Sequence, residues 1–394
     1  MVNNLPQHAM SDVLPCDAQS ALLVGRAWIP GTGPAVIVLR DGELVDITSA
    51  EIPTMSSLLA LEQPVQRAKL AQGRIIGKVE DILTNSIEAQ RQADRAFLLS
   101  PIDLQAVKAA GVTFAASLVE RVIEERTRGE AGRAEDVRAE LQALIGGQLH
   151  ELKPGSEKAM MVRQTMIEQG LWSQYLEVGI GPDAEIFTKC QPLSAVGFGA
   201  HIGIRSDSIW NNPEPEIVLV VSPKEKIVGV TLGNDVNLRD FEGRSALLLG
   251  KAKDNNASCS IGPFIRLFDE HFSLEDVRKA DMNVVIRGQD GFVLDETGSM
   301  TQISRDPLDL VAEAAGSTHQ YPDGFVLFVG SMFAPIKDRD VAGIGFTHKI
   351  EDEVVIASSR LGKLKNVVQS CDACVPWTFG LNALMRNLAE RKLL

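Results

Sequence analysis

The pattern of hydrophobic and polar residues changes along the chain, and the first part of the chain contains short apolar runs that are typical of β-strands. Apolar, partly β-branched runs at 21–28 and 35–39 are followed by turn signals such as Asp41-Gly42. More polar stretches of helical character follow, up to about residue 100. This pattern predicts a small N-terminal domain over residues 1–105 that contains β-strands.

The stretch 117–178 has helical spacing instead. Its apolar residues recur every three or four positions among many Glu and Arg, as at Leu118, Val122 and Ile123. Helices that are polar on one side usually lie over another part of the protein. We expect a mobile helical lid here. The glycines that would serve as its hinges are Gly129, Gly132, Gly146 and Gly147.

From about residue 186 onward, β-branched runs alternate with Gly, Pro and Asn turns. The clearest runs are 217–221, 227–232, 282–287 and 326–329. Two helices have start signals, a capping box at Ser273-Leu-Glu-Asp276 and the pair Asp306-Pro307. We therefore predict a mostly β catalytic domain over residues 106–394.

Two acidic residues precede the first of these runs. Glu214 and Glu216 lie at the mouth of the predicted strand, and residues two apart in a strand share a face. A tight connection at 223–226 makes the next run return antiparallel. If Val221 pairs with Val228, Asp235 lies opposite Glu214. Three carboxylates then converge on one face.

Unscreened carboxylates at contact distance repel one another, so this convergence predicts a cation among them. Oxygen ligands without His or Cys favour Mg²⁺, with Mn²⁺ or Ca²⁺ as alternatives. A loop one residue shorter would turn Asp235 to the other face, and two solvated acids at a strand edge need no metal. The complete hairpin favours the metal site.

The composition of the chain limits the classes of binding partner that we expect. A net charge of −13 without any block of Lys or Arg argues against nucleic acid and against an anionic membrane. A small molecule is the better expectation. The chain start does not resemble a signal peptide and no apolar run reaches membrane-spanning length, so we expect a cytoplasmic protein. The five cysteines, an odd and scattered set, indicate reduced thiols.

Several motifs, taken in order, resemble the signature of the fumarylacetoacetate hydrolase superfamily. They are Pro213-Glu-Pro-Glu216, Gly233-Asn-Asp-Val236, Arg239-Asp240, Lys253 before Gly262-Pro263, Tyr321-Pro-Asp-Gly324, and Gly330-Ser331 before Pro335. The resemblance covers about residues 105–370. It implies an α+β fold with a mixed β-roll catalytic domain, a metal site, and a 2-oxo acid chelated through its carboxylate and keto oxygens.

The 2-keto-3-deoxy-pentonate dehydratases are the most similar branch. The segments Glu185-Ile-Phe187 and Arg205-Ser-Asp-Ser-Ile-Trp210 before the acid pair resemble theirs. Hydrolase branches typically have Tyr-x-x-His-x-x-Glu, whose His and Glu activate water. Here the matching segment is Phe114-Ala-Ala-Ser117-Leu-Val-Glu120, so the imidazole base is missing.

The resemblance therefore implies a hydro-lyase. Its substrate would be a 2-keto-3-deoxy-pentonate derived from D-xylonate or D-arabinonate. A metal-stabilised enolate would lose the C4 hydroxyl, and the products would be 2,5-dioxopentanoate (2-oxoglutarate semialdehyde) and water. The alternatives are an acylpyruvate or diketo-acid hydrolase or decarboxylase of the same superfamily, and a non-catalytic relative that binds 2-oxo acids.

The resemblance also implies the roles of individual residues. Glu214, Glu216 and Asp235 would hold the metal, and Lys253 and Glu185 would transfer protons, in an order that the sequence does not decide. The residues expected to bind substrate are Ser117, Arg205, Asp207 and Ser331. Asp207 is equally interpretable as a structural partner of Arg205. The family likeness further suggests a homodimer or homotetramer.

Overall fold

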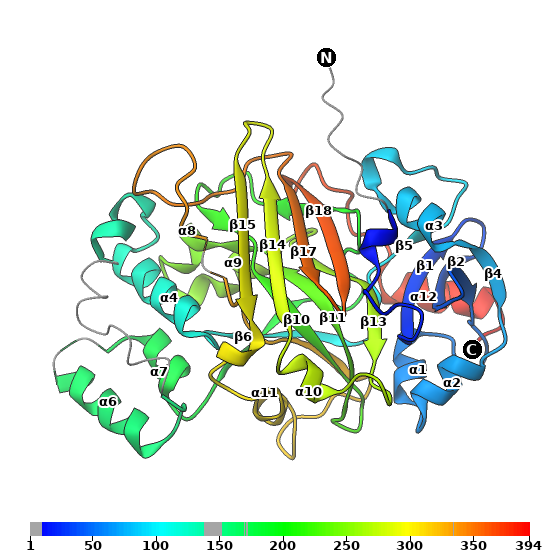
Figure 1. Cartoon of the computed structure of the whole chain (residues 1–394), viewed down its shortest axis with the longest axis horizontal. Helices are drawn as coiled ribbons and strands as arrows, with labels where there is room; N and C mark the ends of the chain where they lie inside the picture. Colours follow the sequence, from blue (N-terminus) through cyan, green and yellow to red (C-terminus); the bar gives the residue numbers. More distant parts are fainter. Residues whose placement is uncertain (1–9, 138–151, 169, 171, 334) are drawn as a thin grey trace.

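The computed structural model describes residues 10–137, 152–168, 170, 172–333 and 335–394. Its largest element is an 11-stranded sheet with the order β4-β3-β2-β1-β13-β11-β10-β16-β6-β7, in which β5 pairs with β1 off this path (Figure 1). Its strands are β1 (Leu23–Ile29), β2 (Gly33–Arg40), β3 (Glu43–Asp46), β4 (Arg74–Lys78), β5 (Phe97–Leu98), β6 (Ala106–Gly111), β7 (Glu185–Cys190), β10 (Pro215–Val221), β11 (Ile227–Asp235), β13 (Cys259–Leu267) and β16 (Phe325–Phe328).

A second sheet has five strands in the order β15-β14-β17-β18-β8. These are β8 (His201–Ile204), β14 (Asp281–Arg287), β15 (Val293–Ser299), β17 (Glu353–Ser358) and β18 (Gly362–Ser370). Both sheets are mixed, because β16 runs parallel to β6 and β18 parallel to β8 while the other paired strands are antiparallel. The short strands β9 (Asn211–Asn212) and β12 (Asn237–Leu238) pair with each other. The chain is thus a mixed α/β protein with large mixed sheets, which agrees with the expected β-roll at this level.

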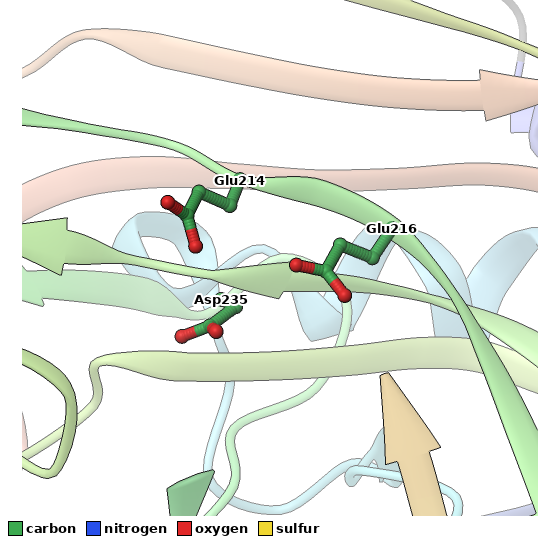
Figure 2. A group of neighbouring side chains, drawn as sticks. All are labelled: Glu214, Glu216 and Asp235. Atoms are coloured by element: carbon green, nitrogen blue, oxygen red, sulfur yellow. The ribbon is translucent and has the colours of Figure 1, made fainter. Parts of the chain in front are cut away.

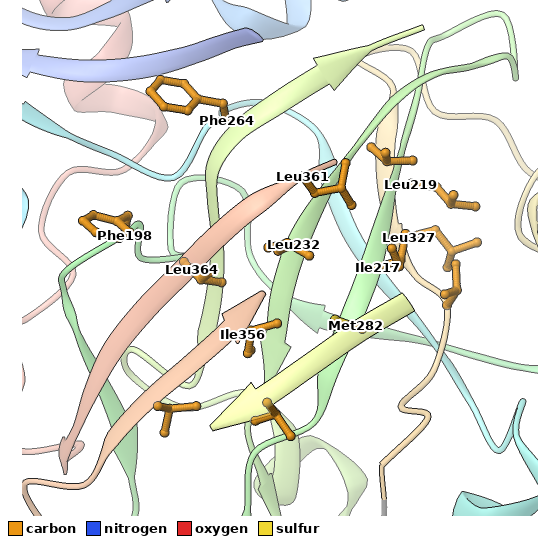
Figure 3. Packing of buried hydrophobic residues seen from close by; sticks show 14 of the residues in the cluster. Phe198, Ile217, Leu219, Leu232, Phe264, Met282, Leu327, Ile356, Leu361 and Leu364 are labelled. Carbon is orange, nitrogen blue, oxygen red and sulfur yellow. The ribbon is translucent and has the colours of Figure 1, made fainter. Parts of the chain in front are cut away.

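The main core lies between the two sheets (Figure 3). Ile217, Leu219 and Leu232 of the large sheet and Ile356 and Leu364 of the small sheet belong to one cluster of buried apolar side chains. Apolar side chains on facing sheets remove each other from water, which is the main favourable term in folding. The five-stranded sheet therefore covers one face of the hairpin β10–β11.

The opposite face of the large sheet is also covered. Val218 and Val220 of β10 pack in a second cluster with Met55 and Leu58 of α1 (Met55–Ala60). Because β10 is buried on both faces, its sequence 217–221 is apolar without alternation. The helix α2 (Pro64–Leu70) adjoins α1, and α12 (Leu381–Glu390) lies beside β1 and β2 (Figure 1).

The N-terminal strands continue the large sheet. Leu23 of β1 pairs with Arg266 of β13, so β1 to β4 extend the sheet that contains β10 and β11. The expected strands at 21–28 and 35–39 are confirmed as β1 and β2. The division into a domain of residues 1–105 and one of residues 106–394 stays a prediction.

Both predicted helix starts are confirmed. The capping box of Ser273 begins α10 (Leu274–Val277). Asp306 caps α11 (Pro307–Ala314) by accepting a hydrogen bond from the Leu308 N–H. The glycine-rich segment Gly197-Phe-Gly199-Ala-His-Ile-Gly203 leads into the strand β8 and not into a helix, so it lacks the structure of a dinucleotide-binding turn. All five cysteines are free, as expected.

Helices cover one end of the large sheet. They are α4 (Ala115–Thr127), α6 (Glu157–Glu168) and α7 (Gln174–Ile180). Their apolar residues, among them Leu118, Ile123 and Leu176, form a third cluster that also includes Val112 and Trp210. The helical character expected for 117–178 is thus present in the described part, whereas Gly146 and Gly147 lie outside the described residues. The mobility of this region stays a prediction.

The remaining helices are short connections around these layers. They include α3 (Val79–Ser86), α8 (Arg239–Glu242) and α9 (Leu249–Lys253). Two of them, α8 and α9, follow β12 and lie near α4 on the same side of the molecule (Figure 1). Within the part of the chain that the structure describes, no helix is both long enough and apolar enough to cross a membrane.

Candidate active site and metal centre

The three predicted metal ligands meet beside the start of β10 (Figure 2). Glu214 precedes β10, Glu216 lies in it, and Asp235 ends β11. From Pro215 to Val220, each residue of β10 pairs with the β11 residue that the predicted register assigns to it. The Asp235 N–H also donates a hydrogen bond to the Glu214 carbonyl at 2.9 Å. One carboxylate oxygen from each of the three residues lies within 4.8 Å of the others. The predicted convergence of the three carboxylates is confirmed.

One detail of the predicted hairpin is wrong. Val221 pairs with Ile227 and not with Val228, because the register shifts between Val220 and Val221. Such an irregularity inserts an extra residue, here Val228, into one strand, so the register on the turn side of it differs by one residue from the register on the Glu214 side. The end of the hairpin at Glu214 and Asp235 therefore keeps the register that places the acids together.

The acids are buried, with exposed fractions of 6% for Glu214, 1% for Glu216 and 1% for Asp235. Glu216 accepts a hydrogen bond from the Gly330 N–H at 2.7 Å. Burial, together with the charges of Asp235 and Glu214, raises the pKa of Glu216 well above its ordinary value. Taking three carboxylates out of water at such short range is unfavourable unless positive charge accompanies them.

The positive charge in this structure comes from basic side chains. Lys253, at the end of α9, forms ion pairs with Glu214 and with Asp235, the latter at 3.1 Å. Lys189 lies 2.8 Å from the other oxygen of Asp235, and Arg121 of α4 pairs with Glu214. Burial favours the neutral form of Lys253, but Asp235 and Glu214 outweigh it and raise the pKa of this ammonium group. Lys253 is therefore protonated here.

Asp235 differs from Glu216 in its charge state. Burial would raise its pKa, but Lys189 and Lys253 together lower the pKa of Asp235 below the ordinary value. Asp235 is therefore a carboxylate in this environment. The ligand set thus contains one acid whose charge is compensated by ammonium groups and another, Glu216, whose charge is not.

One cavity contains the triad and most of the other predicted site residues. Its lining includes Ser117 of α4, Glu185 at the start of β7, Lys253 and Ser331. Burial raises the pKa of Glu185. A Cβ atom at Gly111, which pairs with Glu185, would lie 1.9 Å from the Glu185 Oε2 atom, so glycine leaves room for this carboxylate. Four residues assigned from different parts of the sequence therefore face one space.

Arg205 and Asp207 do not line this cavity. Instead, Arg205 pairs with Asp207 through two hydrogen bonds, each 2.8 Å long, from guanidinium nitrogens to carboxylate oxygens. Both side chains are substantially exposed. This is the structural pairing that the sequence left open. Their assignment to substrate binding stays a prediction, without support from their position in this structure.

Three cavity or near-cavity residues were not identified from the sequence: Arg121, Glu242 and Lys189. Arg121 also pairs with Glu124 and with Glu242, the latter at 3.2 Å, and burial raises the pKa of Glu242 to about 7. The spacing of Ser117, Arg121 and Glu124 at i, i+4 and i+7 is a signal for one polar helix face. Without a partner in view, this spacing is also typical of a solvated helix face.

The donor set fits a hard divalent cation. It offers carboxylate oxygens and no sulfur or imidazole ligand, as Mg²⁺ prefers. The ammonium group of Lys253 lies against two of the three acids, which shows that this spot favours positive charge. Glu214, Glu216 and Asp235 are therefore the residues that would hold the ion.

Solved structures identify the class of fold. Fumarylacetoacetate hydrolase from Exiguobacterium antarcticum aligns with 89% of this chain and 100% of its own, with a TM-score of 0.52 and 14% identity. A 2-keto-3-deoxy-D-arabinonate dehydratase complexed with magnesium and 2,5-dioxopentanoate aligns with 88% of this chain and 99% of its own, with a TM-score of 0.61 and 21% identity. The chain has the fold that these proteins share.

Curated proteins of similar sequence indicate a narrower class than the fold does. A 2-dehydro-3-deoxy-D-arabinonate dehydratase from Saccharolobus solfataricus is 33% identical over 46% of this chain and 57% of its own length. A protein from Haloferax volcanii named "probable 2-keto-3-deoxyxylonate dehydratase" is 30% identical over 51% of this chain and 65% of its own length. The chain thus matches less than two thirds of either relative. No family model matches the chain. The resemblance to the pentonate dehydratases is confirmed in sequence, and the likeness to fumarylacetoacetate hydrolase is confirmed in fold.

We predict that Glu216→Gln weakens Mg²⁺ binding by about 100-fold or more, because it removes a ligand charge, whereas even outer-shell changes cost about 10–100-fold. Isothermal titration of the metal-free protein measures this affinity. The fold should persist, since the variant removes repulsion among buried acids and no apolar packing.

The matched control is Glu62→Gln, whose side chain is 88% exposed and distant from the triad in sequence. It should bind Mg²⁺ like the unmodified protein. Normal Mg²⁺ affinity in a folded Glu216→Gln variant would contradict the ligand assignment.

Proposed function

We propose that this protein is a metal-dependent hydro-lyase that converts a 2-keto-3-deoxy-pentonate to 2,5-dioxopentanoate and water. The observation that supports it most is one cavity that contains the acidic triad, Lys253, Glu185 and Ser117. The names of both curated relatives support the same reaction class. The related structure that contains magnesium and 2,5-dioxopentanoate supports the metal and the product.

A divalent cation held by the triad would supply positive charge for the carboxylate and keto oxygens of a 2-oxo acid, which acidifies its C3 proton. We propose Mg²⁺ as the native ion, with Mn²⁺ and Ca²⁺ as ions of the same ligand preference. The carboxylates themselves remain with the ion, so another group must transfer the protons.

Lys253 and Glu185 are the groups proposed for proton transfer. Dehydration removes a proton from C3 and delivers one to the hydroxyl that leaves C4, so the reaction needs a base and an acid. The enone formed in this way would then tautomerise to 2,5-dioxopentanoate through its enol, by loss of a C5 proton and return of a proton to C3. Glu185 is buried with a raised pKa, which makes it a better base than an ordinary carboxylate and also a competent acid. Lys253 is protonated in the surroundings described here. The division of the two steps between them is open to experiment.

The segment around Ser117 argues for elimination over hydrolysis. A hydrolase needs a base for its nucleophilic water, and a serine hydroxyl without an adjacent base does not accept a proton at neutral pH. The Ser117 hydroxyl donates to the Phe114 carbonyl at 2.8 Å, and Glu120 pairs with Arg239 at 2.8 Å. None of the described residues that line the cavity is a histidine. We propose that Ser117 and Ser331 bind substrate through their hydroxyl groups.

The proposal also includes the finer architecture expected from the sequence. Residues 1–105 would act as a small N-terminal domain and the protein as a homodimer or homotetramer. The helices α4, α6 and α7, which make up the described part of the segment 117–178, would form a lid, which their shared apolar cluster and the position of Ser117 on α4 support. A cluster packed apart from the main core can open at a lower cost than the sheets.

We predict that purified protein with Mg²⁺ and a 2-keto-3-deoxy-pentonate yields a semialdehyde. A coupled 2-oxoglutarate-semialdehyde dehydrogenase and nicotinamide cofactor should then show cofactor reduction at a rate proportional to the amount of this protein. Excess EDTA should abolish the signal and added Mg²⁺ should restore it, because the ligand set consists of hard oxygen donors.

The control is an acylpyruvate offered under the same conditions, which should not be cleaved. Release of pyruvate from the pentonate, or turnover of acylpyruvates alone, would reassign the chain to aldol-type or hydrolytic cleavage. Full activity in excess EDTA would contradict the metal-dependent mechanism.

We predict that Glu185→Gln and Lys253→Met both lower kcat by at least about 100-fold, which is the usual contribution of acid–base catalysis. Exchange of the substrate C3 hydrogen with deuterated water, followed by mass spectrometry, separates their roles. The variant that lacks the base should lose both exchange and product, whereas the variant that lacks the acid should retain exchange without product.

Ser331→Ala serves as the comparison, since it should raise KM more than it lowers kcat. If both acid–base variants retain unmodified exchange and turnover, the proton transfers belong to other residues.

We predict that α4 and α7 become more protected from hydrogen exchange when pyruvate and Mg²⁺ bind together, because closure over the cavity would exclude water. Mass spectrometry of peptides from these helices measures the change. Peptides from β17 and β18, on the other sheet, provide the internal reference. Equal protection of the helices with and without ligand would argue against a lid.

A further inference from the structure

Lys189 has no part in the proton transfers proposed above, yet it is one of the most deeply buried charges in the structure. It lies in β7, its side chain has an exposed fraction of 0%, and it does not line the cavity. Burying an ammonium group is costly unless its surroundings compensate for the lost hydration. The contacts of Lys189 should therefore explain why a lysine occupies this position.

Three oxygen atoms surround the ammonium group. The Nζ atom forms an ion pair with the Asp235 Oδ1 atom at 2.8 Å. It donates hydrogen bonds to the carbonyl of Val236, at 3.0 Å, and to the carbonyl of Lys253. One lysine thus joins β7 to the end of β11 and to the end of α9.

We propose that Lys189 is a positioning residue of the metal centre, which holds Asp235 and the Lys253 backbone from behind the cavity. The inference rests on the metal site of the proposed function and adds to it a residue that lies behind the ligands. In this role Lys189 contacts neither metal nor substrate. It acts through a ligand and through the candidate proton-transfer residue.

The two oxygens of Asp235 have different partners. Lys189 approaches Oδ1, whereas Lys253, which lines the cavity, lies 3.1 Å from Oδ2. Lys189 therefore fixes the rotation of the carboxylate with Oδ2 on the cavity side. Groups that orient a ligand in this way strengthen metal binding because the ligand does not lose freedom when the ion binds.

The same ammonium group fixes the base of the Lys253 side chain. The Lys253 carbonyl accepts from the Lys189 Nζ atom and from the Ser258 hydroxyl, the latter at 2.7 Å. With its backbone held by two donors, Lys253 reaches Glu214 and Asp235 from a defined point. The position of one ligand and one proton-transfer group then depends on a single buried charge.

The test is the Mg²⁺ affinity of the metal-free full-length protein carrying Lys189→Met, measured by isothermal titration calorimetry. Methionine has a similar length and no charge. We expect the dissociation constant for Mg²⁺ to rise by about 10–100-fold, the usual effect of losing an outer-shell partner. Circular dichroism and the thermal unfolding midpoint verify that the variant is folded.

Lys108→Met is the matched control. Lys108 lies in the adjacent strand β6, where it pairs with Thr188, the neighbour of Lys189, and donates to the Thr188 hydroxyl at 3.0 Å. The substitution is the same and the site is one strand away, without a contact to the triad. We expect its Mg²⁺ affinity to equal that of the unmodified protein.

A second variant covers the case in which Lys189→Met does not fold. Lys189→Arg retains the positive charge, but the larger guanidinium group displaces Asp235 in a fully buried space, so we expect weaker Mg²⁺ binding in a folded protein. A Mg²⁺ dissociation constant within twofold of the unmodified value in either folded variant overturns the proposal. Failure of both variants to fold also overturns it, since Lys189 would then be a purely structural residue.

The measurement needs no substrate. Normal Mg²⁺ binding in the variants would contradict the role of Lys189 while leaving the dehydratase reaction intact. An unmodified protein that binds Mg²⁺ but forms no semialdehyde would contradict the proposed reaction and not the role of Lys189.

Discussion

The structure depends on charge balance at the buried end of the β10–β11 hairpin. Glu214, Glu216 and Asp235 lie within a few ångströms of one another and are nearly inaccessible to solvent. An unpaired ion in such a place costs several kcal/mol, about the stability margin of a whole domain. Four surrounding elements supply basic side chains. Three of these contact the triad directly: Arg121 from α4, Lys189 from β7 and Lys253 from α9. Arg239 from α8 pairs instead with Glu124, a partner of Arg121.

This requirement links the fold to the chemistry. The apolar faces of β10 place the hairpin between two layers, one formed by the five-stranded sheet and one by α1 and its neighbours. Rigid packing on both faces keeps the acids close in spite of their repulsion. A cation bound there would supply positive charge that Lys253 and its neighbours now supply, so metal binding would change the charge state of the nearby titratable groups.

The helical region contributes to the site from outside the two sheets. α4 contributes Ser117 and Arg121 to the cavity, while its apolar residues pack with α7 and not with the main core. Ion pairs between Arg239 and Glu120 and between Arg239 and Glu124 also join α4 to α8. In the proposed lid, these ion pairs would rearrange more readily than a packed apolar core.

The sequence by itself determined that Glu214, Glu216 and Asp235 converge, because residues near each other in a hairpin follow from strand periodicity and register. It also identified the main strands, two helix caps and, through ordered motifs, the superfamily likeness. It did not determine the register shift at Val221, the surface position of Arg205 and Asp207, or the extension of the large sheet by β1 to β4. Only the tertiary structure showed that Lys189 and Arg121 meet the triad. Both come from elements far from the hairpin in the chain, and contacts between distant elements depend on how whole sheets and helices pack, which local patterns of residues do not specify.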